Sequence, residues 1–67
     1  MKSTVKKSVK RAEHLLNAYE RLAGSHDTAD ILADILADLR HYCDAKKLPF
    51  HTASDLSYTY YLGEKRP

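Results

Sequence analysis

The sequence has little of what ties small folds together through covalent or metal bonds. Its 67 residues include one cysteine, two glycines, two prolines and no tryptophan. A single cysteine excludes an internal disulfide, and no cysteine–histidine set with metal-ligand spacing takes its place. Two distant glycines cannot form a glycine-rich phosphate loop. The fold must therefore depend on helix packing, and a core of this size contributes only about 3–5 kcal/mol without help.

Long hydrophobic runs are also missing, as is a hydrophobic signal region at the start. No segment approaches the roughly 20 apolar residues of a membrane-spanning helix. We therefore expect a protein of the reducing cytoplasm with no membrane partner, in which Cys43 is a small packing residue. The net charge is only +2, but residues 1–11 carry five cations and no acid, whereas residues 12–44 carry seven acids. The chain is therefore electrostatically polarised.

The most regular pattern lies at residues 29–40, where the phrase Ala-Asp-apolar-apolar occurs nearly three times. On a helix, this four-residue step puts Ile31, Ile35 and Leu39 in one apolar row. The aspartates of the repeat form an acidic edge beside it: Asp30, Asp34 and Asp38. We expect a central helix over residues 28–46 with Asp27 as its N-cap.

Similar spacing predicts two further helices, over residues 4–23 and 50–62. Gly24 and Gly63 are expected to end them, leaving residues 63–67 as a solvated tail, and Pro49 separates the second helix from the third. The expected fold is one all-α domain, a small three-helix bundle that is mostly antiparallel with the second helix at its centre. Its predicted core comprises Val9, Leu16, Tyr19, Ile31, Ile35, Leu39, Tyr42, Phe50 and Leu56. An antiparallel pairing of the first two helices would bring Lys6, Lys10 and Arg11 near Asp38 and Asp44.

The sequence offers no convincing catalytic or metal-binding set. His41 and Cys43 are two positions apart, so on a helix they point to nearly opposite sides and cannot act together. His26, Asp30 and Asp34 have the spacing of a weak helical chelate, but a capping loop beside a solvated acidic face explains them more simply. We therefore expect a non-catalytic protein without metal or cofactor.

Nucleic-acid binding is the alternative function. The basic residues of the first helix can contact phosphates without sequence preference: Lys6, Lys7, Lys10 and Arg11. Helices over residues 28–46 and 50–62 are spaced like a helix-turn-helix. The second of them, however, has no lysine or arginine with which to contact bases. A basic segment that is merely solvated is the competing interpretation.

Protein binding is the function that the residues favour. Tyrosines are enriched at protein interfaces, and an acidic edge suits a partner surface. The candidate partner-binding residues are Asp34, Asp38, His41, Tyr58 and Tyr61. Apolar positions also exceed what one small bundle can cover, so a homodimer is a further expectation.

A phrase at the end of the central helix resembles a known group of proteins. Leu39-Arg40-His41-Tyr42-Cys43-Asp44, followed by Leu48-x-Phe50, is similar to short uncharacterised proteins encoded by phages, plasmids and neighbouring bacterial chromosomes. The resemblance covers about residues 29–62, and Pro49 replaces the usual aspartate. It implies a bacterial or phage cytoplasmic accessory protein. Such proteins often act by binding a host or phage protein, and they include inhibitors of host defence systems.

Overall fold

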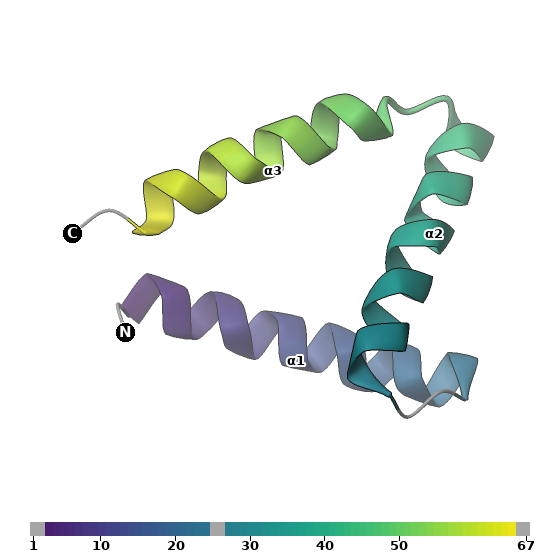
Figure 1. Ribbon diagram of the computed structural model, residues 1–67, viewed down its shortest axis with the longest axis horizontal. Helices are drawn as coiled ribbons and strands as arrows, with labels where there is room; N and C mark the ends of the chain where they lie inside the picture. The colour runs from purple at the N-terminus through teal and green to yellow at the C-terminus, as the bar shows by residue number, and fades with distance from the viewer. Residues whose placement is uncertain (1–2, 25–26, 66–67) are drawn as a thin grey trace.

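The computed structural model describes residues 3–24 and 27–65, and it contains three helices and no strand over those residues. The helices are α1 (Ser3–Ala23), α2 (Thr28–Lys46) and α3 (Phe50–Lys65) (Figure 1). The predicted all-α fold with three helices is confirmed. The bounds of α2 are those expected, whereas α1 begins one residue earlier and α3 ends three residues later than predicted.

Two residues set the ends of the helices at the first break. Gly24 has a φ of +77° and its N–H donates to the Glu20 carbonyl at 2.8 Å, which closes the last turn of α1. The carboxylate of Asp27 accepts from the N–H groups of Ala29 and Asp30 at 2.9 and 3.2 Å. Both assignments made from the sequence are therefore confirmed, because each residue satisfies backbone groups that a helix end leaves open.

The second break is built by a residue that the sequence did not single out. Lys47 has a φ of +58°, and its N–H donates to the Asp44 carbonyl at 3.3 Å. The Leu48 N–H donates to the Cys43 carbonyl at 2.8 Å. These two bonds form a Schellman motif with a lysine in the position usually held by glycine. Pro49 then precedes α3, and its carbonyl accepts the Ala53 N–H at 3.1 Å.

The prediction that Gly63 ends the third helix is wrong. α3 continues through Gly63 to Lys65, and Gly63 does not adopt the positive φ that ends a helix in a left-handed residue. Lys65 lies in the last turn, where a cation is favourable near the helix C-terminus. Its ammonium also lies 5.1 Å from the ring centroid of Tyr61, one turn earlier. Both interactions involve Lys65, which follows Gly63, so they favour continuation of the helix past Gly63.

The helices form three sides of a flat frame (Figure 1). α1 and α3 run in opposite directions on opposite sides, as expected for antiparallel helices, while α2 crosses between their far ends and is not aligned with either. The Cα envelope measures 36 × 29 × 16 Å, and the radius of gyration is 13.6 Å. A compact domain of this length would have a radius of about 11 Å. The frame is therefore open, and its helices border a space that a packed core does not fill.

An open frame leaves most apolar side chains uncovered, because a core forms between two packed layers. Among the described residues only Ile31 is buried, and the predicted core residues Leu16, Tyr19, Ile35 and Phe50 are half-buried. The core prediction is wrong for the four that remain exposed: Val9, Leu39, Tyr42 and Leu56. Their apolar character is compatible with burial, but none of the three described helices covers them.

Candidate functional site

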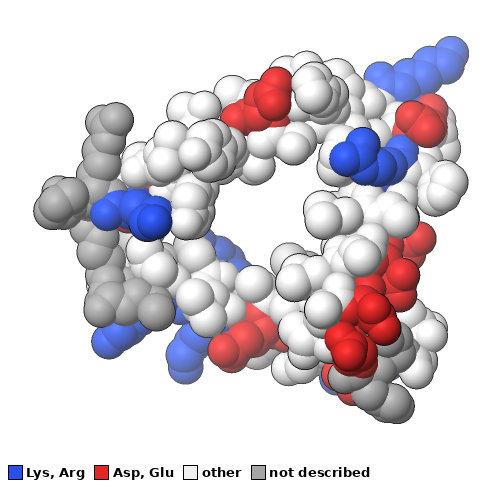
Figure 2. Space-filling model, viewed as in Figure 1, with Lys and Arg blue, Asp and Glu red and all other residues white. Residues whose placement is uncertain are grey.

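An opening in the middle of the frame is the most prominent surface feature. The space-filled molecule surrounds it, and most atoms at its edge belong to uncharged residues (Figure 2). We call it the central opening, bordered by the inner sides of α1, α2 and α3. Two apolar hollows lie in corners of the frame, one between α2 and α3 and one between α1 and α3.

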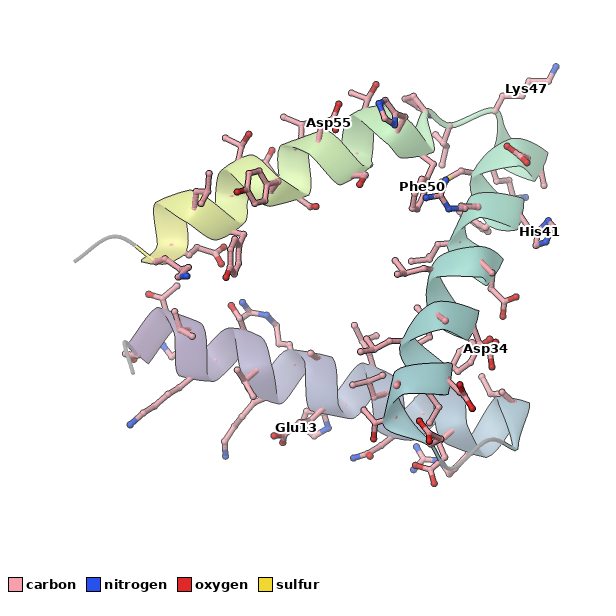
Figure 3. All side chains as sticks on the ribbon, in the orientation of Figure 1. Glu13, Asp34, His41, Lys47, Phe50 and Asp55 are labelled. Carbon is pink, nitrogen blue, oxygen red and sulfur yellow. The ribbon has the colours of Figure 1, made fainter. Side chains whose placement is uncertain are left out.

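The hollow in the α2–α3 corner has a volume of about 240 Å³. Its lining is mostly apolar: Leu36, Leu39, Phe50, Ala53, Ser54 and Ser57. The side chain of Phe50 points inward at this corner (Figure 3). Leu36 and Leu39 are 51% and 45% exposed, although both belong to the most regular apolar seam of the sequence. This corner therefore offers an apolar hole of the kind into which a side chain of another helix packs.

Arg40 stabilises the same corner from the outside of the hollow. Its guanidinium carbon lies 4.4 Å from the centroid of the Phe50 ring, a cation–π contact that joins α2 to α3. Arg40 and Phe50 both belong to the phrase over residues 39–50. That phrase thus has a structural role at the α2–α3 corner, whatever else it does.

The second hollow, about 250 Å³ in volume, lies where the free ends of α1 and α3 approach. α1 contributes Val5, Ser8, Val9 and Ala12, and α3 contributes Tyr61, Glu64 and Lys65. The rings of Tyr58 and Tyr61 are 6.2 Å apart and inclined by 23°. Of the two predicted partner-binding tyrosines, Tyr61 lines this hollow, and the ring of Tyr58 stacks on the ring of Tyr61.

The acidic edge is separate from those tyrosines. Asp34 and His41 point from α2 away from the central opening (Figure 3). Asp38 accepts a hydrogen bond from the hydroxyl of Tyr19 on α1. The structure thus divides the predicted partner-binding residues into an α2 group and an α3 group, and it gives Asp38 a contact within the chain.

The surroundings of Tyr19 raise the pKa of its hydroxyl to about 12. The main cause is the hydrogen bond to Asp38, followed by partial burial and by the negative charges of Asp38 and Asp34. An ionised Tyr19 would place a third negative charge beside these carboxylates, so the neutral phenol is favoured.

The basic residues of α1 lie elsewhere than predicted. Lys6, Lys7, Lys10 and Arg11 are all exposed, and the Arg11 guanidinium donates to the Ser8 hydroxyl at 3.2 Å. Over residues 3–24 and 27–65, no ion pair joins these four cations to a carboxylate. The expected proximity of Lys6, Lys10 and Arg11 to Asp38 is wrong, because α2 crosses α1 near Tyr19 rather than lying along its basic half.

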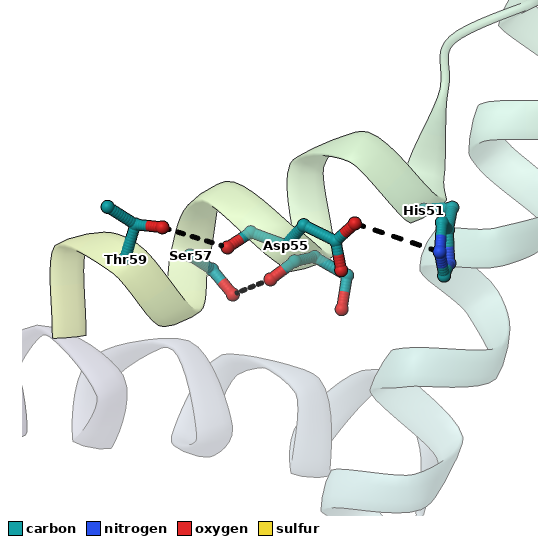
Figure 4. Close-up of polar contacts among 5 residues, drawn as sticks. His51, Asp55, Ser57 and Thr59 are labelled. Atoms are coloured by element: carbon teal, nitrogen blue, oxygen red, sulfur yellow. Dashed lines mark hydrogen bonds and ion pairs between the residues drawn. The ribbon is translucent and has the colours of Figure 1, made fainter. Parts of the chain in front are cut away.

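Local polar contacts run along α3 (Figure 4). His51 and Asp55 form an i,i+4 ion pair at 3.7 Å, while the Ser57 and Thr59 hydroxyls donate to the Ser54 and Asp55 carbonyls. The side chains of His51 and Asp55 are 93% and 71% exposed, so this pair contributes little to stability. These contacts belong to the helix itself and do not assemble a site.

Potential metal and catalytic groups are scattered. In the part of the chain that the structure describes, no three histidine, cysteine, aspartate or glutamate side chains are grouped to hold a metal ion. Cys43 is half-buried and His41 is exposed. His26, the candidate chelating residue, lies outside the described residues.

Comparison with known proteins gives no information about the function of this chain. No protein family, curated protein or solved structure matches this chain. None of the helices, over the residues described, combines the length and apolar character needed to cross a membrane. The sequence predicted Tyr61 as a partner-binding residue, but it did not indicate that Leu36, Leu39 and Phe50 form an exposed apolar surface. The available signal was the surplus of apolar positions on the central helix.

Proposed function

We propose that this chain is a non-catalytic protein-binding domain that acts through the apolar surface of the central opening. The incomplete burial of Leu36, Leu39 and their neighbours carries the proposal. Contiguous apolar surface of this kind marks interaction sites, because exposing it to water is unfavourable. Tyr61 at the opposite corner adds an aromatic side chain of the type enriched at interfaces.

The biological setting follows from the resemblance of residues 29–62 to phage- and plasmid-encoded proteins. We place the chain in the bacterial cytoplasm as an accessory protein whose partner is a host or phage protein. Inhibition of a host defence system is the role that this setting favours. The missing catalytic cluster among the described residues is compatible with inhibition by occupancy, but the resemblance is what supports the role.

A comparative pull-down tests the binding surface. Leu36→Glu places a charge in the α2–α3 hollow, whereas Leu22→Glu makes the same change at a side chain that is 86% exposed and lines neither corner hollow. Tagged wild-type protein should capture a discrete protein that resists nuclease treatment, and Leu22→Glu should retain it. Loss on Leu36→Glu, with helical content unchanged by circular dichroism, supports the proposal. Equal capture by both variants contradicts it.

Nucleic-acid binding is the second candidate. It is favoured by the four exposed cations of α1, which have no carboxylate partner within residues 3–24 and 27–65. Changing Lys6, Lys7 and Lys10 to glutamate should then weaken binding to DNA or RNA of any sequence. On duplex DNA, the slope of log affinity against log salt should fall by about 0.9 for each phosphate that the variant no longer neutralises. Unchanged affinity and slope would exclude this function for the basic segment.

A further inference from the structure

The open frame of helices leaves far more surface exposed than a compact chain of this mass. The solvent-accessible surface is 5838 Å² for a mass of 7.6 kDa. A compact monomer of that mass exposes about 4,300 Å². The excess is roughly 1,500 Å² per chain, so two chains that each cover it would bury about 3,000 Å², within the range of obligate homodimer interfaces.

We propose that a second copy of this chain covers the central opening, face to face, and forms the second layer of a shared core. This inference rests on the proposed function's assignment of the opening to protein contact, and it makes a second copy, in place of a host or phage protein, the occupant of the opening. The middle of the frame is open and is edged mostly by uncharged residues (Figure 2). A second frame supplies apolar side chains of the same kind to cover it.

Charge favours a second copy as the occupant. The basic half of α1 and the acidic edge of α2 belong to one chain, yet within the described residues no ion pair joins them. A two-fold axis in the plane of the frame, parallel to α2 and through the middle of α1, lays the two α1 helices antiparallel and brings the basic half of each to the α1–α2 corner of the other. Lys6 and Lys10 of one copy then approach Asp30 and Asp34 of its partner, and the symmetry repeats the contact. The charges form the rim around an apolar centre.

Molecular mass in solution tests the inference. Sedimentation equilibrium of the purified chain should give twice 7.6 kDa, and the thermal midpoint should rise with protein concentration, because dissociation accompanies unfolding. Leu36→Glu should raise the dimer dissociation constant by about thirtyfold or more, as expected for a central interface position. Leu22→Glu should leave it unchanged. A wild-type chain that remains monomeric across the accessible concentrations overturns the proposal.

Charge reversal gives a test that does not depend on a core variant folding. One variant carries Lys6→Glu and Lys10→Glu, and the other carries Asp30→Lys and Asp34→Lys. Each should dimerise poorly alone, because like charges then meet at both rims. An equimolar mixture should recover the wild-type mass, since a mixed pair restores opposite charges at both rims. No recovery on mixing contradicts the proposed arrangement.

The outcomes separate this inference from the proposed function. A monomeric chain whose Leu36→Glu variant loses a captured protein overturns the second copy and leaves protein binding intact. A monomeric chain with no Leu36-dependent capture overturns both.

Discussion

The Tyr19 hydroxyl donates a hydrogen bond to the Asp38 carboxylate and so joins α1 to α2. The contact fixes where α2 crosses α1, at the point where the frame turns its first corner. It also gives Asp38, which remains exposed on the acidic edge, a partner within the chain.

Alkaline pH should loosen this corner. The pKa of Tyr19 is raised from 10 to about 12, so the contribution of the hydrogen bond to stability is complete below about pH 10 and is lost as the pH rises through 12. Wild type should therefore lose stability over this range more steeply than Tyr19→Phe, which lacks the ionisable hydroxyl. Thermal melts of both proteins from pH 9 to 12 measure the difference, and parallel profiles would contradict the assignment. Lysines titrate alike in both proteins and cancel.

The two glycines should respond in opposite directions to alanine. Gly24 has a φ of +77°, which a side chain disfavours, so Gly24→Ala should destabilise the protein by about 1–2 kcal/mol. Gly63 is helical, with nothing within 4 Å of an added Cβ. Gly63→Ala should therefore stabilise it by about 0.5–1 kcal/mol. Urea unfolding at one protein concentration measures both changes. Destabilisation by Gly63→Ala would mean that α3 ends at Gly63, as the sequence predicts.

Replacing Lys47, which has a left-handed backbone conformation, with glycine should stabilise the protein. Its φ of +58° costs a side chain about 1–2 kcal/mol, while glycine loses part of that gain through its greater freedom in the unfolded chain. Lys47→Gly should therefore raise the free energy of unfolding by roughly 0.5–1 kcal/mol. Lys46→Gly is the matched control within α2 and should lower it by a similar amount. Equal losses in the two variants would show that Lys47 is not the cap.

The contact between Arg40 and Phe50 should be measurable as a coupling energy. Arg40→Met keeps an unbranched apolar side chain and removes the charge, and Phe50→Leu removes the aromatic face. In a double-mutant cycle by urea unfolding, the two changes should couple by about 0.5–1 kcal/mol, the usual size of a partly exposed cation–π contact. Arg40→Met combined with His51→Ala is the control pair and should be additive. Additivity of Arg40→Met with Phe50→Leu would contradict the contact.

The sequence by itself determined the helices and most of their ends. The four-residue repeat, the cap at Asp27 and the glycine at position 24 act within a few residues, so their effects do not depend on distant parts of the chain. The same local reasoning wrongly predicted that Gly63 ends α3, and it did not identify Lys47 as the residue that ends α2. A helix end depends on whether the following residues can bond back, and residue type indicates this only in part.

Only the tertiary structure decided which apolar side chains are covered. Periodicity places Leu39 in the apolar row of α2 that begins at Ile31 and Leu36 beside that row, but it does not determine which elements will pack against them. α2 crosses α1 near Tyr19, and the three helices form an open frame with a radius of gyration of 13.6 Å. Whether a side chain is buried depends on which element packs against it. In this protein the three helices leave the apolar surface of α2 at Leu36 and Leu39 open.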